Sequence, residues 1–375
     1  MYNLIRLIEK PTLVLNAFTV HENIRAMAER ARRWGVAFRP HFKTHQSAEI
    51  GNWFKDEGVR SITVSSLEMA EYFTQHGWDD ITIAFPFNPR QMLGYDQLAR
   101  RVRLGVVIES AEVVTLLDER ATAAMDVWIK IDVGSRRTGI AVDDVEQVCT
   151  LAQRAMASKK LILRGLLTHA GNTYRQNSRE AVAEVNQSSI SGLNRIREAL
   201  HSRGAKGLLI SIGDTPACTL CDPIGEVDEI RPGNFVLYDA MQLAHGVCRF
   251  DQVAVALACP VVAKHPQRGE IVIHGGAVHL SSEFYEADGR RIYGLVCPPR
   301  DDGWGEPLPG TTVSRLSQEH GIVTAGSQAM AQISVGDLVF VLPAHSCITI
   351  ACMRRYLTTG GEWIEAAGSQ PWVTL

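Results

Sequence analysis

The stretch ENIRAMAERARRWGVAFRPHFKTHQ, residues 22–46, contains the unit of local structure that recurs through much of the chain. Its first part places apolar side chains at i, i+3, i+4 and i+7: Ile24, Met27, Ala28 and Ala31. That spacing predicts an amphipathic helix near residues 18–34, and Gly35 is a typical helix stop. A strand is predicted directly afterwards, at 36–42. We therefore expect a helix that covers a sheet.

The same alternation of apolar runs and helix-like segments continues from residue 12 to about 240. Eight of the runs are candidates for barrel strands: 36–42, 61–65, 81–85, 104–109, 127–132, 162–168, 208–212 and 235–238. Eight strands with helical crossovers predict an α/β fold, a closed parallel (β/α)8 or TIM barrel. The run at 12–15 is one strand too many for that closure, so we assign it to a second domain.

From about residue 250 the pattern changes. The apolar runs QVAVALAC, GEIVIH, RIYGLVC and DLVFVLP are separated by turn residues and lack helical spacers. This pattern predicts a separate β domain. We therefore expect a barrel over residues 16–248, and a β domain made of residues 1–15 and 249–375.

The composition narrows the class of protein. The chain has 375 residues, 38 basic and 41 acidic side chains, and a formal net charge of -3. This balance is typical of globular proteins, and it provides no charge excess for a nucleic-acid partner. No apolar run reaches the ~20 residues that span a bilayer, so we expect no membrane association. Eight cysteines are too sparse for a disulfide scaffold, and without an export signal we expect a soluble cytoplasmic protein with reduced thiols.

Lys43 follows the first predicted barrel strand, in RPHFKTHQ. It thus lies at the C-terminal end of the barrel, where barrel enzymes keep their catalytic groups. His41 and His45, when protonated, would lower the pKa of this lysine and favour the free amine that forms a Schiff base. The alternative is an ordinary solvated charge, because lysine is rarely buried.

The seventh predicted strand ends in SIGDTPACTL, where Gly213, Asp214 and Thr215 form a turn that opens a predicted helix. Backbone N–H groups at a helix start bind phosphate, and the loops after barrel strands seven and eight are the usual site. Asp214 would repel phosphate unless its carboxylate points away. The alternative is a helix N-cap with Pro216 at the first helical position. A Schiff-base lysine and a phosphate cradle are together what pyridoxal phosphate requires.

Eight motifs occur in an order that resembles a known family: PTLVLNAFTVHENIRAM, RPHFKTH, DVGSRRTG, THAGNTY, GDTP, EIRPGNFVLYD, QEHG and PAHSC. They resemble the D-threonine aldolase and eukaryotic-type D-serine dehydratase family, a branch of the alanine racemase fold type. The likeness covers nearly the whole chain, and RPHFKTH with PAHSC is its most specific pair. It implies a pyridoxal phosphate barrel, a C-terminal β domain and a homodimer.

The resemblance also implies roles for individual residues in the barrel. Lys43 is expected to hold the cofactor and act as the catalytic base, and Gly213, Asp214 and Thr215 to form its phosphate loop. Further residues are expected to contact cofactor or substrate: Arg137 at the phenolate, Arg231 and Tyr238 along the pyridine ring and phosphate, and Tyr174 with His169 as catalytic contacts. The alternative for Tyr174 is a packed ring whose hydroxyl contacts water, and the alternative for the arginines is an ion pair with a structural carboxylate.

His345 and Cys347 occur two apart in VLPAHSCITI, which has the pattern of a strand. In a strand both side chains would leave the same face and could bind one metal between them. Two protein ligands leave positions open for water and a substrate oxygen, as a catalytic metal needs, although a lone His-x-Cys is also a common coincidence. Thiolate with imidazole favours zinc, with manganese or magnesium as alternatives. Dehydratases of the family carry this pair, whereas its D-threonine aldolases have an aspartate at the cysteine position.

Three other clusters have weaker signals. Cys218 and Cys221 form CTLC without a second pair at zinc-ribbon spacing, so we expect buried thiols. His274 and His279 in HGGAVH would point to opposite faces of a regular strand, although the glycines could bend it. Relatives usually carry Asp-x-Gly at the start of this segment, so the substrate-facing wall differs here. His320 in QEHG receives no role.

The expected function is that of a pyridoxal phosphate- and metal-dependent ammonia-lyase. The resemblance implies a β-hydroxy D-amino acid substrate, such as D-serine or D-threo-3-hydroxyaspartate, and a 2-oxo acid and ammonia as products. Retro-aldol cleavage is the first alternative and racemisation the second. A non-catalytic pyridoxal phosphate carrier is a third, but such carriers end after the barrel, whereas this chain continues with a β domain.

Overall fold

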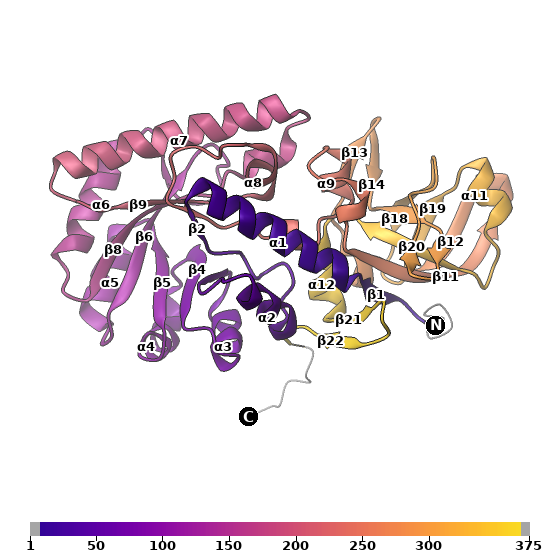
Figure 1. Ribbon diagram of the computed structural model, residues 1–375, viewed down its shortest axis with the longest axis horizontal. Helices are drawn as coiled ribbons and strands as arrows, with labels where there is room; N and C mark the ends of the chain where they lie inside the picture. The colour runs from indigo at the N-terminus through magenta and orange to yellow at the C-terminus, as the bar shows by residue number, and fades with distance from the viewer. Residues whose placement is uncertain (1–7, 369–375) are drawn as a thin grey trace. The chain divides into compact units, whose positions relative to one another are not determined.

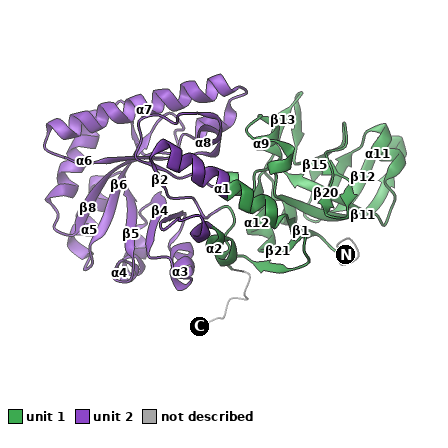
Figure 2. Ribbon diagram, in the orientation of Figure 1, with its two compact units in different colours: residues 1–24, 44–53, 234–375 green, residues 25–43, 54–233 purple. Residues whose placement is uncertain are grey.

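The computed structural model describes residues 8–368. These fold into two compact units: unit 1 contains the described residues 8–24, 44–53 and 234–368, and unit 2 contains residues 25–43 and 54–233 (Figure 2). The expected β domain includes residues 1–7 and 369–375, and these lie outside the described residues. The sequence-based limits, with the barrel at 16–248, differ from the limits of these units, and they stay a prediction.

Unit 2 is a ring of parallel strands (Figure 1). Its strands are β2 (Ala37–Phe38), β3 (Ile62–Val64), β4 (Asp80–Pro86), β5 (Arg103–Ile108), β6 (Met125–Asp132), β8 (Leu161–Leu167), β9 (Leu209–Ile212) and β10 (Glu229–Ile230), with β7 (Ile140–Ala141) beside β6. They run in the order β2-β10-β9-β8-β6-β5-β4-β3. A parallel bridge between His41 and Thr63 joins the two ends of this order. The barrel expected from the sequence is confirmed.

Helices alternate with these strands along the chain. They are α1 (Ala17–Trp34), α2 (Ala48–Asp56), α3 (Leu67–Gln75), α4 (Met92–Ala99), α5 (Ala111–Arg120), α6 (Val145–Ala157), α7 (Arg179–Ser202) and α8 (Thr215–Leu220). The predicted stripe of α1 is buried, with Ile24 fully inaccessible, and Gly35 ends the helix at a φ of 69°. Ser66, Ser110 and Ser178 cap the starts of α3, α5 and α7, where their hydroxyls accept backbone N–H groups.

One predicted barrel strand is wrong. Residues 235–238 do not form the eighth strand, which is β10 at Glu229–Ile230. Asn234–Val236 instead form a 3-10 turn, in which the backbone N–H groups of Leu237 and Tyr238 donate to the Asn234 carbonyl. The apolar run there is fully buried, and burial alone does not distinguish a strand from a turn.

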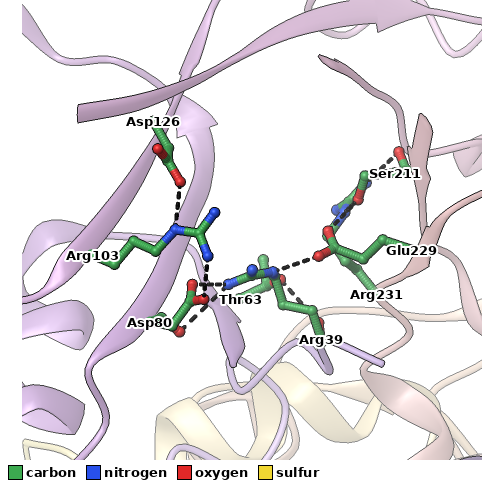
Figure 3. A network of polar contacts seen from close by, with 8 residues as sticks. All are labelled: Arg39, Thr63, Asp80, Arg103, Asp126, Ser211, Glu229 and Arg231. Carbon is green, nitrogen blue, oxygen red and sulfur yellow. Dashed lines mark hydrogen bonds and ion pairs between the residues drawn. The ribbon is translucent and has the colours of Figure 1, made fainter. Parts of the chain in front are cut away.

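Paired charged groups tie several barrel strands together (Figure 3). Arg39 Nη1 lies 2.5 Å from Asp80 Oδ1, and its Nε lies 2.7 Å from Glu229 Oε2. The other Glu229 oxygen accepts from Ser211 Oγ at 2.6 Å, and Ser211 Oγ accepts from Arg231 Nε at 2.6 Å. Because these charges are paired and hydrogen-bonded, they are tolerated in the interior. The chain of contacts also fixes Arg231, which follows β10.

Unit 1 contains a second, mainly antiparallel sheet. Its strands are β1 (Thr12–Leu15), β11 (Val255–His265), β12 (Glu270–His274), β15 (Gly294–Cys297), β18 (Thr312–Leu316), β19 (His320–Thr324), β20 (Leu338–Pro343), β21 (Arg355–Thr358) and β22 (Trp363–Glu365). Strand β11 pairs with both β12 and β20, so six of them close into a barrel in the order β12-β19-β18-β15-β20-β11. The short helices α10 (Ala277–Leu280) and α12 (Ser346–Met353) follow β12 and β20. Among residues 8–368, no helix combines the length and the apolar character needed to cross a bilayer.

Candidate active site

A cavity of about 200 Å³ opens where several unit 2 strands reach their C-terminal ends. Its walls come from segments far apart in the sequence: His41, Lys43, Ser65, Ala84, Phe85, Pro86, Lys130, Arg137, Thr138, Leu167, His169 and Arg231. Four of the predicted site residues therefore meet here, namely Lys43, Arg137, His169 and Arg231. This is the end of the barrel at which (β/α)8 enzymes place their chemistry.

Lys43 is held at the cavity by its neighbour in the chain. Phe42 is fully buried and packs on the rings of Phe54, Phe73 and Trp78, with ring centroids 4.9–5.1 Å apart. The backbone N–H of Phe42 also donates to the Thr63 carbonyl at 2.8 Å. This packing fixes the backbone that carries Lys43, whose side chain lines the cavity.

The two histidines beside Lys43 do not act as the sequence suggested. Burial lowers the pKa of His41 well below its usual value, and the positive charges of Lys43 and Arg231 lower it further. Burial also lowers the pKa of His45 to about 3, and His45 Nδ1 accepts the Ser47 N–H at 3.1 Å. Both rings are therefore neutral at neutral pH. The prediction that these histidines are protonated beside Lys43 is wrong.

Lys130 is a second lysine in this cavity, and the sequence reasoning gave it no role. It lies on β6 and is only 5% exposed. Burial, helped by the charges of Arg231 and Arg137, lowers its pKa to about 7. A signal for it existed in the sequence, since Lys130 interrupts the apolar strand MDVWIKID. A lysine within a buried strand is rare unless it serves a site.

His169 and Tyr174 lie beside the loop that follows β9. His169 Nδ1 hydrogen-bonds the Gly213 carbonyl, so this nitrogen carries the proton and Nε2 keeps its lone pair. Burial, followed by the charge of Lys43, lowers the pKa of His169 well below its usual value. The Tyr174 hydroxyl accepts the Thr215 N–H at 3.2 Å, and its ring centroid is 5.9 Å from that of His169.

The predicted phosphate loop has the form of a helix N-cap. Asp214 Oδ1 accepts from the Ala217 N–H at 2.7 Å and from Thr173 Oγ1 at 2.9 Å. Its carboxylate is thus bonded within the loop, and burial raises its pKa to about 6. A side chain at Gly213 would lie 2.7 Å from the Arg231 carbonyl, so only glycine fits there. The capping role is present, and phosphate binding by Gly213, Asp214 and Thr215 stays a prediction.

The cavity suits an anionic ligand such as pyridoxal phosphate. Four basic side chains line it, Lys43, Lys130, Arg137 and Arg231, and its lining contains no acidic side chain. Arg231 is 4% exposed and is positioned by Ser211 and the Thr168 carbonyl. Tyr238 belongs to unit 1 and is not part of this lining, so its expected cofactor contact stays a prediction.

His345 and Cys347 lie in unit 1, but not in a strand. Strand β20 ends at Pro343, His345 is the N-cap of α12, and Cys347 lies in the first turn of that helix. The expectation that a strand presents both side chains on one face is wrong, because Pro343 and Ala344 lead the chain out of the sheet. The two side chains nevertheless form a hydrogen bond with each other.

Buried polar groups surround this pair. His345 Nδ1 lies 3.3 Å from Asp239 Oδ2, which also accepts from Asn234 Nδ2 at 2.7 Å. Thr44 Oγ1 lies 3.2 Å from Cys347 Sγ. A carboxylate on one imidazole nitrogen orients the ring and leaves the other for a metal. The sequence reasoning missed Asp239, whose only signal was its position in the EIRPGNFVLYD motif.

The structure also places the cysteine pair and the histidine pair that gave weaker signals in the sequence. Cys218 and Cys221 are buried, at 0% and 7% exposure, and the eight cysteines, all within residues 8–368, are free thiols. His274 ends β12 and His279 lies in α10, so the intervening glycines turn the chain and the two rings come within 5.4 Å. Both face Glu319, which the sequence reasoning did not single out.

Two regions of the chain match known families. Residues 15–240 match the family described as alanine racemase, N-terminal domain, and residues 254–359 match a putative serine dehydratase domain. The chain is 30% identical to D-threo-3-hydroxyaspartate dehydratase of Delftia sp. (strain HT23), over 98% of this chain and 97% of that protein. It is 27% identical to D-serine dehydratase of Dictyostelium discoideum, over 92% and 91% of the two chains. It is also 27% identical to D-threonine aldolase of Arthrobacter sp, over 90% and 86%.

Solved structures give the same result for the fold. The structure of the Delftia dehydratase superposes with a TM-score of 0.90 at 27% identity, covering 99% of this chain and all of that one. A cysteine-to-alanine variant of a D-threo-3-hydroxyaspartate dehydratase, solved in a metal-free form, superposes with a TM-score of 0.87 at 27% identity, over 99% and 100% of the two chains.

Proposed function

The chain belongs to the family that joins an alanine racemase N-terminal domain to a serine dehydratase domain, and on this premise we propose that it is a pyridoxal phosphate- and metal-dependent lyase. Its proposed reaction is the dehydration of a β-hydroxy D-amino acid, such as D-serine or D-threo-3-hydroxyaspartate, to a 2-oxo acid and ammonia. The observation that carries the proposal is the His345–Cys347 pair with its buried orienting carboxylate, Asp239.

The barrel cavity supplies the groups for the first half of the reaction. Pyridoxal phosphate, when bound, withdraws electron density from the Cα of an attached amino acid. Lys43 Nζ would hold the cofactor and then, as a free amine, take the Cα proton as general base. The cationic side chains of Arg137 and Arg231 would bind anionic groups of cofactor and substrate.

The second half of the reaction needs a group that helps hydroxide to leave. His345 Nε2 and Cys347 Sγ would hold a divalent metal, and the thiolate favours zinc. A metal with two protein ligands keeps open positions and supplies Lewis acidity. In support, a D-threo-3-hydroxyaspartate dehydratase solved in a metal-free form is a cysteine-to-alanine variant. Thr44, the contact of Cys347, follows Lys43 directly in the chain.

Retro-aldol cleavage is the alternative, because a D-threonine aldolase is also a relative. Cleavage of Cα–Cβ needs a base for the β-hydroxyl proton, whereas elimination needs that oxygen to leave. The cysteine at position 347, where the aldolases carry aspartate, favours elimination. Racemisation would use no metal, and a non-catalytic cofactor carrier would have no use for the β domain. A homodimer and a cytoplasmic location complete the proposal.

Product analysis over a small panel of D-amino acids tests the proposal. We expect 2-oxo acid and ammonia from D-serine or D-threo-3-hydroxyaspartate, and no turnover of the L-isomers, whose Cα–H would point away from Lys43. The matched control is the Lys43→Ala variant on the same panel, which should be inactive. Glycine and acetaldehyde from D-threonine, with no 2-oxo acid from any hydroxy D-amino acid, would establish the aldolase alternative.

A further inference from the structure

We propose that unit 1 contains a second metal site, formed by His274, His279 and Glu319. The site is separate from the His345–Cys347 pair, and its ligands are two imidazole nitrogens and one carboxylate oxygen. It would take a transition metal such as zinc, with one coordination position open. The proposal does not depend on the reaction proposed above.

The three ligands come from three different elements that the backbone holds together. His274 is the last residue of β12, His279 lies in α10, and Glu319 directly precedes β19. The Gly275 N–H donates to the Glu319 carbonyl at 3.0 Å, and the Ala277 N–H donates to the Ser317 carbonyl at 2.8 Å. These bonds extend the β12–β19 ladder beyond its last strand pair and fix the ligand backbones before any metal binds.

Gly276 is the residue that makes this approach possible. A Cβ at this position would lie 2.4 Å from the Gln318 carbonyl oxygen and 2.5 Å from the Glu319 carbonyl carbon. Only glycine lets the 274–279 turn pack so closely on residues 317–319. The turn also reverses the expectation for a regular strand, in which His274 and His279 would point to opposite faces.

The distances between the donor atoms fit a metal better than they fit hydrogen bonds. His274 Nε2 lies 3.5 Å from Glu319 Oε2, and His279 Nε2 lies 3.8 Å from the same oxygen. All three donor atoms lie within 4.8 Å of one another. Hydrogen bonds of this kind are shorter, about 2.7–3.2 Å. A tetrahedral zinc with ligand bonds of about 2.0–2.1 Å separates its ligands by about 3.4 Å.

The surroundings favour an open site over a closed structural one. Three protein ligands leave one position of a tetrahedral zinc for another group, as in catalytic zinc sites with two histidines and a glutamate. A cavity of about 370 Å³ is lined by His274 and His279 together with the basic side chains of Lys10 and Arg355. The open position would therefore take water or an anionic group. His279 Nδ1 is buried and has no hydrogen-bond partner among the described residues, so the polar stabilisation of this half-buried ring depends on Nε2.

Metal counting on the purified full-length protein tests the proposal. After chelation, dialysis and reloading with zinc alone, we expect two zinc ions per wild-type chain. Glu319→Gln and His279→Ala should each retain one, with the affinity for the lost ion reduced more than about 100-fold, because a direct ligand is removed. Cys347→Ala should also retain one, and the Cys347→Ala/His279→Ala double variant none. His320→Ala removes an adjacent imidazole that contacts Ser317 instead, so it should keep two.

Cobalt distinguishes the two sites, because only a thiolate ligand produces strong sulfur-to-cobalt charge-transfer absorption. The Glu319→Gln protein should keep this absorption, and the Cys347→Ala protein should lose it while still binding one cobalt. A wild-type chain that binds one zinc, unchanged by His279→Ala, would overturn the second site. So would two zinc ions that Glu319→Gln and His279→Ala both leave in place. Loss of a zinc ion in His320→Ala would overturn the ligand assignment. Absence of the Cys347-dependent ion alone would overturn only the first metal centre.

Discussion

Replacing Asp239 by asparagine tests whether a buried carboxylate orients the His345–Cys347 metal centre. Asp239 is completely inaccessible to solvent. Its Oδ2 accepts from Asn234 Nδ2 at 2.7 Å and from the Ser346 N–H at 3.2 Å, and its Oδ1 accepts from the Gln242 N–H at 2.9 Å. Each of these neighbours donates a hydrogen bond. His345 Nδ1, 3.3 Å from Asp239 Oδ2, is also a donor when Nε2 of the same ring binds the metal.

The size of the effect follows from that arrangement. An asparagine side chain has one acceptor oxygen, so its amide NH2 must face at least one of the donors in either rotamer. A buried donor left without an acceptor costs about 1–3 kcal/mol of folding free energy. Loss of the carboxylate that orients a ligating histidine lowers metal affinity about 10- to 100-fold. We therefore expect Asp239→Asn to be less stable and to bind the metal at Cys347 more weakly.

Two measurements check this prediction. A cobalt titration followed by thiolate charge-transfer absorption reports the site at Cys347 alone, and urea unfolding reports the stability. Asp251→Asn is the matched control, because Asp251 is exposed and pairs with the exposed Arg249, at 3.0 Å. The control should behave like the wild type. An Asp239→Asn protein that is destabilised but keeps wild-type cobalt affinity would refute the orienting role.

Three further predictions concern the lysines and the metal. Borohydride treatment of the protein with bound pyridoxal phosphate should attach the cofactor to the peptide that contains Lys43, and attachment to Lys130 or Lys264 would contradict the assignment. Chelation, or Cys347→Ala, should abolish turnover and leave the visible absorption of the bound cofactor largely intact; full activity of Cys347→Ala after chelation would exclude the metal role. Burial lowers the pKa of Lys130 to about 7 in the folded chain from 10.5, so the unfolded state binds more protons between these values and stability rises with pH there. We therefore expect Lys130→Met to raise the free energy of unfolding of the cofactor-free chain, measured with urea, more at pH 7 than at pH 9. A gain that is the same at both pH values would contradict the lowered pKa of Lys130.

The sequence by itself determined the barrel and singled out several of the residues that line its cavity. The apolar stripe of α1 and the alternation of apolar runs are local patterns. Side-chain spacing within a short segment distinguishes a helix from a strand there. The motif RPHFKTH put Lys43 at the end of a barrel strand, and the cavity lies there. The strand predicted at 235–238 was wrong, because a short apolar run can be buried equally well in a turn.

Only the tertiary structure decided the electrostatics and the partners of these residues. His41 and His45 are neutral, and Lys130 is shifted, because segments distant in the sequence exclude water from them. Asp239 reaches His345 across 106 positions of the chain, and Glu319 reaches His274 across 45. Spacing within a motif cannot predict such contacts. Burial and long-range pairing depend on which elements pack together, and this packing sets both the charge of each group and the ligands that can meet at one point.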